Sequence, residues 1–182
     1  MNLSPLEWRY LDTIQTWRNA PSTRAHVRET RYLSSSDQHD WFDRQRADDT
    51  VRYMMATEPW EREFISPPKL LGLVGLTSID WINRRAEVSV LSPEHERECL
   101  ELLVGYAFDT LGLHRLEGET ITKNRDVLLQ DHGFEMESFR VHAYWRNGDW
   151  VDSTRWALLN SDADTPPETL DAMTRRYRRA PL

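Results

Sequence analysis

Apolar positions near the start of the chain recur at the spacing of an amphipathic helix. Ser4 as an N-cap and Pro5 at the first helical position predict where this helix begins. Because the residue before a proline avoids helical backbone angles, the helix should end before Pro21. A second start signal at residues 35–38 predicts another helix. The buried stripe of the first helix comprises Leu6, Tyr10, Ile14 and Trp17.

The pattern then changes from helical to extended spacing. Residues 51–56 form a short predicted strand, and residues 57–68, which contain three prolines and mixed charges, form a loop. Residues 70–79 are almost continuously apolar, so this strand should be covered on both faces in the middle of a sheet. A polar turn at 80–85 and a strand at 86–91 complete a predicted hairpin.

The strongest helical pattern in the chain covers residues 93–111 and follows Ser92. Its apolar stripe comprises Leu100, Leu103, Val104, Ala107, Phe108 and Leu111. A strand at 115–122 comes next, so the helix should cross over between two strands of one sheet. Residues 124–132 then predict a short helix.

A closing hairpin is predicted across Asn147 and Gly148, since Asn-Gly is typical of two-residue hairpin turns. Its two strands cover residues 134–145 and 150–159. The polar residues after this hairpin predict a linker, followed by a short helix at 167–179.

These elements predict an α+β domain with a mixed, largely antiparallel central sheet flanked by helices. The domain should occupy residues 1–160, with the polar linker and short helix at 161–182. A chain of 182 residues is long enough to bury a core of its own. Cys99 is the single cysteine, so neither an internal disulfide nor a cysteine-based metal site is expected, and no histidine pair has metal-ligand spacing.

The net charge and the distribution of apolar residues limit the partners and the location that we expect. The net charge of −7 disfavours binding to nucleic acid or an anionic membrane. We expect no signal peptide and no membrane span, and therefore a cytoplasmic protein. The exception to the negative charge is a basic cluster at Arg175, Arg176, Arg178 and Arg179. These cations either stabilise the end of the last helix or contact an acidic partner.

Several stretches, in this order, resemble the GNAT N-acetyltransferase superfamily, and in particular its branch of ribosomal-protein and nucleotide-sugar N-acetyltransferases. The opening helices are similar at residues 17–21 and 35–42. The central hairpin is similar at LLGLVGLTSIDWINRRAEVSV, residues 70–90, and the long helix and next strand at YAFDTLGLHRLEGETITKN, residues 106–124. Gly133-Phe134 and residues 148–152 resemble the last hairpin. The resemblance implies the GNAT fold, with acetyl-CoA as the acyl donor.

The chain departs from the family pattern after the strand at 86–91. In the family a glycine-containing loop follows this strand, and its backbone N–H groups and the helix N-terminus cradle the pyrophosphate of acetyl-CoA. Here about five residues of that loop are missing, and no glycine occurs between residues 76 and 104. Glu94, Glu96 and Glu98 stand in its place, with Arg97 as the compensating cation. This departure predicts weak binding of the pyrophosphate, because carboxylates repel phosphates.

A second departure follows Asn124. The family has a tyrosine about seven positions after the matching asparagine, and this tyrosine protonates the departing thiolate. Here the predicted helix is shorter and has no tyrosine, serine or threonine. His132 is a weak substitute as general acid, because it does not fall at the matching position.

The resemblance also suggests where the remaining site residues lie. Glu87 is the candidate general base for the acceptor amine, although a glutamate on the solvated face of a strand would look the same. Donor-binding candidates are the strand backbone at Val88, Ser89, Val90 and Leu91, together with Arg97 and Asn124. Candidates for the acceptor groove are Trp17, Arg18, Asp80, Trp81 and Asn83, with core packing as the alternative for Trp17. No metal site is expected.

Two hypotheses of different classes follow. The first, which the two departures favour, is a degenerate GNAT domain, a pseudoenzyme that acts as a binding or structural module and binds no cofactor. The second is an active N-acetyltransferase that uses acetyl-CoA and acetylates a primary amine on a peptide N-terminus or an amino sugar. Protein partners and a homo-oligomer are compatible with both.

Overall fold

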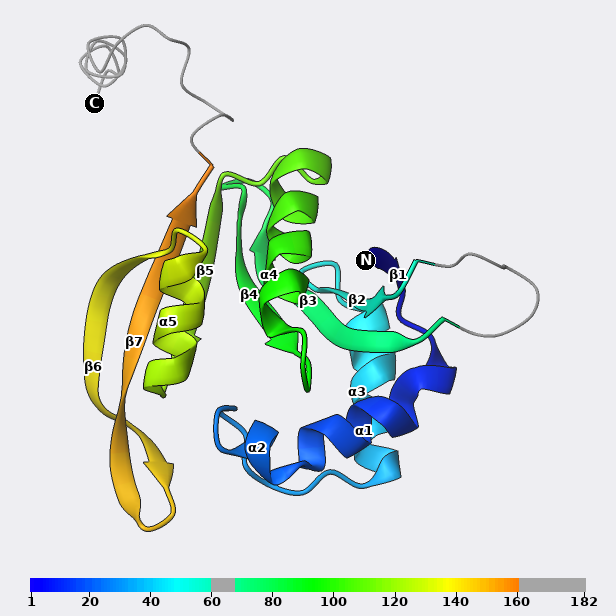
Figure 1. Ribbon diagram of the computed structural model, residues 1–182, viewed down its shortest axis with the longest axis horizontal. Helices are drawn as coiled ribbons and strands as arrows, with labels where there is room; N and C mark the ends of the chain where they lie inside the picture. Colours follow the sequence, from blue (N-terminus) through cyan, green and yellow to red (C-terminus); the bar gives the residue numbers. More distant parts are fainter. Residues whose placement is uncertain (60–67, 161–182) are drawn as a thin grey trace, which may run out of the picture.

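The computed structural model describes residues 1–59 and 68–160, which form one twisted sheet with helices on both faces (Figure 1). The sheet order in these residues is β1-β2-β3-β4-β5-β7-β6. Its strands are β1 (Asn2–Pro5), β2 (Arg52–Thr57), β3 (Leu70–Asp80), β4 (Arg85–Leu91), β5 (Arg115–Thr120), β6 (Glu135–Arg146) and β7 (Asp149–Leu159). Neighbouring strands are antiparallel except β4 and β5, which are parallel. This arrangement confirms the predicted α+β fold with a largely antiparallel mixed sheet.

The helices pack on the sheet as two separate layers. They are the 3-10 turn η1 (Trp8–Tyr10), α1 (Leu11–Asn19), α2 (Pro21–Arg24), α3 (Ser35–Arg46), α4 (Glu96–Gly105), the π-helical turn η2 (Tyr106–Thr110) and α5 (Lys123–Asp131). Side chains of α1 and α3 pack with Leu73 of β3, whereas α4 and α5 pack with Val74. Because successive residues of a strand point to opposite faces, these helix pairs cover opposite faces of the sheet.

The N-terminal residues form an edge strand, so the prediction of a helix starting at Ser4 and Pro5 is wrong. β1 pairs with β2 in the register Asn2 to Thr57 and Pro5 to Met54. A proline is tolerated on an edge strand, because its missing N–H removes no bond to a neighbour. The predicted stripe is confirmed, since Tyr10 and Ile14 are buried and α1 ends at Asn19, before Pro21.

The predicted strands and the closing hairpin are confirmed to within a few residues. β3 is buried along most of its length, as its continuous apolar character requires. Asn147 and Gly148 both have positive φ, 51° and 88°, which a type I′ turn needs at its two central residues. The 93–111 segment connects the parallel strands β4 and β5, which confirms the predicted crossover.

The beginning of that crossover helix differs from the prediction, which placed it at Pro93. Ser92 is buried and its hydroxyl donates to the Leu71 carbonyl at 2.6 Å, so this residue remains attached to β3. The same hydroxyl accepts the N–H of His95 at 2.9 Å, and α4 begins only at Glu96. A connection of four residues, 92–95, therefore joins β4 to α4.

Two predicted segments lie wholly or partly outside the described residues: most of the 57–68 loop, and the linker, helix and basic cluster of 161–182. Within the described part of the chain, no helix is long and apolar enough to cross a bilayer. The same residues contain no group of three or more His, Cys, Asp or Glu side chains placed to bind a metal ion.

Candidate functional site

A pocket of about 280 Å³ opens where the two parallel strands separate. The ladder between β4 and β5 runs from Arg85 and Arg115 to Glu87 and Glu117, and the described residues extend it no further. Beyond this point, the space between the strands is walled by Val88, Ser89 and Val90 of β4 and by Gly118, Glu119 and Thr120 of β5, with Leu100, Leu128 and Leu129 beneath them. The pocket therefore combines an apolar floor with open strand edges.

The backbone of residues 88–90 is paired on one side only. These residues bond to β3, with Val88 opposite Leu76 and Val90 opposite Val74. On the β5 side they have no ladder partner among the described residues. Amide groups of an extended ligand could thus pair with this edge, as an added strand would.

The missing side chain of Gly118 lets α5 approach β5 at the pocket wall. A Cβ on Gly118 would lie 2.9 Å from Cδ1 of Leu129, which is closer than carbon atoms pack. Leu129 is buried there and belongs to the same core as Leu100. The glycine therefore allows the α5 side chains to form the floor of the pocket.

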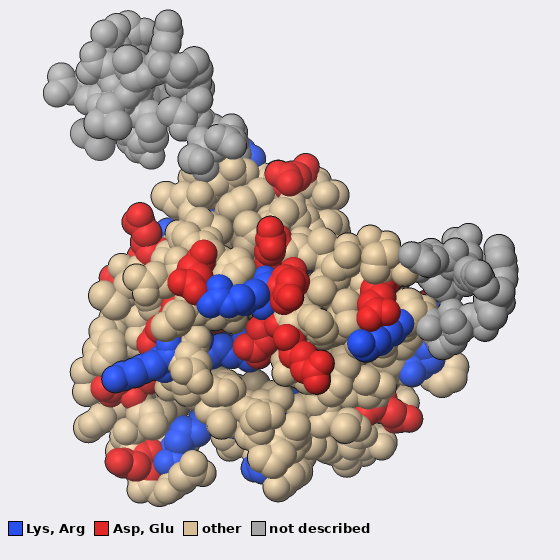
Figure 2. Space-filling model, viewed as in Figure 1, with Lys and Arg blue, Asp and Glu red and all other residues tan. Residues whose placement is uncertain are grey.

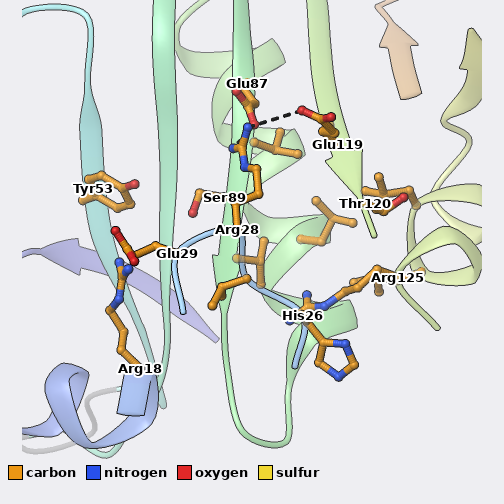
Figure 3. Close-up of a pocket in the computed structure, with 17 residues that line it drawn as sticks. Arg18, His26, Arg28, Glu29, Tyr53, Glu87, Ser89, Glu119, Thr120 and Arg125 are labelled. Carbon is orange, nitrogen blue, oxygen red and sulfur yellow. Dashed lines mark hydrogen bonds and ion pairs between the residues drawn. The ribbon is translucent and has the colours of Figure 1, made fainter. Parts of the chain in front are cut away.

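Glu87 lies at the closed end of the pocket, and its side chain is 19% exposed. It forms an ion pair with Arg28, whose guanidinium also lies 3.5 Å from Glu119 (Figure 3). Arg28 comes from the segment between α2 and α3, so one arginine links this segment to two strands. Two carboxylates and one guanidinium thus define the polar end of the pocket.

Glu119 is the more buried of these two carboxylates, with a side chain only 3% exposed. It accepts hydrogen bonds from Ser153 Oγ at 2.6 Å, Tyr144 Oη at 3.1 Å and Arg140 Nη1 at 3.0 Å. Burial alone would raise its pKa, but the hydrogen bonds from Ser153 and Tyr144 and the charges of Arg140 and Arg28 outweigh burial and lower the pKa. Glu119 is therefore an ionised anchor for the arginine.

Polar contacts with β6 and with Thr122 hold the segment that carries Arg28 over the pocket. Arg146, at the end of β6, donates to the carbonyls of Val27, at 3.0 Å, and Arg28. Nδ1 of His26 lies 3.1 Å from Oγ1 of Thr122. The segment thus forms one wall of the pocket and fixes the position of the Arg28 guanidinium.

Tyr53 reaches the pocket from β2, across β3. Its ring occupies the space that a side chain at Gly75 of β3 would need, because a Cβ on Gly75 would be 2.3 Å from the ring carbons. The ring also meets Trp41 of α3 edge to face, with 5.0 Å between centroids. Burial raises the pKa of the Tyr53 phenol, despite a hydrogen bond with Ser89 that lowers it. The phenol therefore stays protonated at neutral pH.

The start of α4 has more acidic than basic groups. Glu96 and Glu98 occupy its first turn, and Glu94 lies just before it. Arg97 forms an ion pair with Asp131 of α5. Arg125 of α5 forms one with Glu96, and burial lowers the pKa of the Arg125 guanidinium. Both arginines that adjoin this helix start thus already have carboxylate partners.

The structure brings together five of the residues predicted from the sequence. Glu87, Val88, Ser89, Val90 and Arg18 all line the pocket between β4 and β5. Figure 3 shows Arg18 on the α1 side, opposite Glu87 and Glu119.

The other residues predicted to bind the donor or to act as the general acid lie elsewhere. Leu91 is buried against the α1 side of the sheet. Arg97 and Asn124 line a separate hollow of about 380 Å³ beside the start of α4. His132 lies at the end of α5, with Nδ1 at 2.7 Å from the Leu128 carbonyl and Nε2 at 3.1 Å from the Arg97 carbonyl. Since both ring nitrogens face carbonyls, His132 is not directed into the pocket between the strands.

The predicted acceptor residues other than Arg18 also lie away from this pocket. Trp17 packs in the core between α1 and the sheet. The turn between β3 and β4 is at the opposite end of β4 from α4. There Asp80 accepts from the Asn83 backbone at 2.9 Å, and Trp81 Nε1 donates to the Asp49 carbonyl at 3.1 Å. These contacts give the turn residues structural partners.

Seven polar residues of the pocket were not identified from the sequence: His26, Arg28, Glu29, Tyr53, Glu119, Thr120 and Arg125. Arg28 lies in a segment without periodicity, so no local pattern marks it. For Glu119 the sequence held a weak indication. It lies on the same strand face as Glu117, and the strand of these two residues neighbours the strand of Glu87.

The family model and the most similar known proteins both indicate an acetyltransferase family. A model of the acetyltransferase (GNAT) domain matches residues 1–135. The spermidine N(1)-acetyltransferase of Vibrio cholerae is 30% identical over 112 residues, which cover 56% of this chain and 65% of that enzyme. This chain therefore spans slightly less than two thirds of the Vibrio cholerae relative. The Escherichia coli K12 spermidine N(1)-acetyltransferase is 25% identical, over 93% of this chain and 94% of that enzyme.

Solved structures give the same fold. The crystal structure of spermidine N-acetyltransferase from Vibrio cholerae in complex with CoA and spermine superposes with a TM-score of 0.77, at 25% identity, over 89% of this chain and 96% of that one. A dodecameric structure of the same kind of enzyme has a TM-score of 0.69, at 24% identity, over 88% and 94% of the two chains. These relatives are polyamine acetyltransferases, whereas the sequence resembled the ribosomal-protein and nucleotide-sugar branch.

Proposed function

The chain belongs to the acetyltransferase (GNAT) domain family, and from this premise we propose that it transfers an acetyl group from a CoA thioester to a primary amine of a polyamine. The observation that carries the proposal is the pocket at the separation of β4 and β5, with Glu87 at its closed end. Relatives named for acetylation of spermidine support the enzyme over the noncatalytic module expected from the two sequence departures.

Carboxylates in the pocket offer partners to a cationic acceptor. Glu29, Glu87 and Glu119 line it together with three arginines, and one of these, Arg28, already places a guanidinium between two of the carboxylates. A carboxylate pair that holds one cation can hold an ammonium group in the same way. A polyamine has several ammonium groups along an apolar chain, which matches acidic groups beside an apolar floor better than an amino sugar or a peptide N-terminus does.

The pocket fits one part of the donor. The unpaired edge at Val88–Val90 offers backbone groups to the amides of a pantetheine arm, and the floor is apolar. The start of α4, by contrast, does not suit the pyrophosphate. Three glutamates, Glu94, Glu96 and Glu98, lie at or just before the first turn of this helix, and the two nearby arginines already form ion pairs with carboxylates. When bound, the thioester supplies an activated acyl carbonyl and a thiolate leaving group.

The residues of this chain divide the proton transfers between them. Glu87 accepts a proton from the acceptor ammonium, directly or through a water molecule, so that the amine nitrogen can form its bond to the acyl carbon. Tyr53 is a protonated phenol in the same pocket, and it can donate a proton as the carbon–sulfur bond breaks. Arg28 forms an ion pair with the Glu87 carboxylate and so orients it in the pocket.

The test is acetyl transfer to spermidine by the wild type and by Glu87→Gln. We expect kcat to fall by about 10²–10⁴-fold when the general base is removed, with a smaller change in the KM for the donor. The matched control is Glu135→Gln, an exposed glutamate on β6 that does not line the pocket. An unchanged kcat in Glu87→Gln, with the control also unchanged, would exclude Glu87 as the base.

We also propose that the protein is a homo-oligomer. Several large apolar side chains of the β6–β7 hairpin are more than half exposed: Met136, Phe139, Val141, Trp145 and Trp150. Exposed apolar side chains this close together are typical of a surface that another protein covers. The relative from Vibrio cholerae is described as dodecameric, which supports a second copy of the chain as the partner.

A further inference from the structure

The pocket between β4 and β5 has only one direction in which a long ligand can leave along β4. The ladder at Arg85–Glu87 closes one end, and the strand edge runs from Val88 toward Leu91. At about 3.3 Å per residue, the edge from Glu87 to Leu91 is about 13 Å long. A thioester arm whose sulfur lies beside Glu87 therefore emerges at residues 92–95 and the start of α4.

The groups at this exit are unfavourable to phosphates. Glu94 and Glu98 are exposed, and Glu96 shares the same first turn of α4. Figure 2 shows acidic side chains gathered over the start of α4, with basic side chains beside them toward α5. Those basic groups are not available, because Arg97 is paired with Asp131 and Arg125 with Glu96.

Two of the four residues in the connection 92–95 offer a phosphate no backbone donor. Pro93 has no N–H, and the N–H of His95 is already bound by the Ser92 hydroxyl at 2.9 Å. Ser92 is buried and its hydroxyl donates to the Leu71 carbonyl, which holds the start of the connection against β3. A phosphate at the exit would thus meet carboxylates, and neither Pro93 nor His95 has a free N–H to offer it.

We infer that this enzyme recognises its acyl donor through the pantetheine arm and not through the nucleotide phosphates. Its donor class is therefore acyl thioesters of pantetheine, with the nucleotide of CoA adding nothing to binding. This inference rests on the proposed function, because it assumes that a thioester arm lies along β4. Glu94 and Glu98, the exposed carboxylates at this exit, are the residues that set the donor specificity.

The test compares acetyl-CoA with S-acetylpantetheine as donors for the full-length wild type, with spermidine as the acceptor. We expect the two kcat/KM values to agree within about tenfold, which corresponds to about 1.4 kcal/mol. Added salt should raise kcat/KM for acetyl-CoA and leave that for S-acetylpantetheine unchanged, since salt screens repulsion between exposed charges. A preference for acetyl-CoA of about tenfold or more would overturn the inference.

Variants of the exposed carboxylates distinguish an effect of charge on the donor phosphates from a general effect on the folded structure. Glu94→Gln combined with Glu98→Gln should raise kcat/KM for acetyl-CoA several-fold and leave S-acetylpantetheine unaffected. Glu101→Gln, an exposed position of the same helix further from its start, is the matched control and should change neither value. An equal effect of the double variant on both donors would show that the carboxylates do not act on the phosphates.

Calorimetric titration with CoA and with pantetheine makes the inference testable without activity. We expect similar dissociation constants for the two compounds. Binding of CoA at least tenfold tighter than pantetheine, or no binding of either, overturns the inference. Absence of acetyl transfer with both donors, combined with equal binding, would instead contradict the proposed function and leave the binding inference standing.

Discussion

Glu119 illustrates how a buried charge is kept in this site. Its carboxylate is nearly inaccessible, yet it accepts bonds from Ser153 and Tyr144 and adjoins Arg28 and Arg140. Buried carboxylates are tolerated when their oxygens are paired in this way, and the loss of partners leaves an uncompensated charge. The network therefore holds the Arg28 guanidinium in place, next to Glu87.

Cys99 gives a test of packing at the scale of one residue. The thiol is fully buried on α4 against Gly72, and burial raises its pKa to about 11. The reactive species is the thiolate, which burial both suppresses and shields. We expect no labelling of the native protein by a thiol reagent at pH 8, and labelling of one thiol per chain in denaturant.

Because Cys99 is the single cysteine, the labelling stoichiometry has one interpretation. Fast stoichiometric labelling of the native protein would contradict the packing of α4 against β3. A rate that increases with denaturant concentration in parallel with unfolding would support it.

At the scale of elements, two glycines predict opposite effects of the same substitution. Gly75 lies on β3 under the Tyr53 ring, and a Cβ there would be 2.3 Å from ring carbons. Gly75→Ala should therefore lower the free energy of unfolding by about 1–3 kcal/mol, through displacement of the ring. Because Tyr53 lines the pocket, acetyl transfer should decrease as well.

Gly105 is the matched control for this substitution. It ends α4 with helical backbone angles, and the nearest atom to an added Cβ is 3.8 Å away. Gly105→Ala should raise the free energy of unfolding by about 0.5–1 kcal/mol, since glycine is a poor helix residue. Denaturant unfolding measures both variants, and destabilisation of equal size in both would contradict the steric explanation.

The helix α4 keeps its packing although only four residues, 92–95, connect it to β4. The Ser92 hydroxyl at the start of this connection donates to the Leu71 carbonyl of β3. The helix still packs through Cys99, Leu100 and Leu103, which are all fully buried. The proposed change in donor recognition therefore leaves the packing of this helix intact.

At the scale of the whole molecule, the β6–β7 hairpin extends from the domain (Figure 1). Several of its large apolar side chains are exposed. Sedimentation or light scattering of the wild type should give a mass above that of the 21.6 kDa chain. The double variant Phe139→Ser and Val141→Ser should shift the distribution toward smaller species. Each buried apolar side chain contributes about 1.5–3 kcal/mol, so the dissociation constant should rise by about 10²-fold or more.

Val127→Ser is the matched control for the oligomer, because this exposed residue lies on α5, away from the hairpin. It should leave the mass unchanged. A monomeric wild type at all concentrations would contradict the proposed homo-oligomer, and dissociation by both variants would point to general destabilisation.

The sequence by itself determined most of the elements and their order. Periodicity marked the buried stripe of α1, the buried strand β3 and the crossover helix, because these patterns depend on neighbours within a few residues. The Asn147-Gly148 turn was equally local. The same locality explains the error at Ser4 and Pro5, which become an edge strand only because β2, about fifty residues later, offers a pairing edge.

Only the tertiary structure decided the composition of the site. Glu87 was found from the sequence, but its partner Arg28 is 59 positions away and Glu119 is 91 positions from Arg28. Such contacts depend on how β4 and β5 separate and on how the segment between α2 and α3 crosses the gap. The sequence also showed the carboxylates at the start of α4, but only the fold placed them at the end of the β4 edge, where we propose that they oppose phosphate binding.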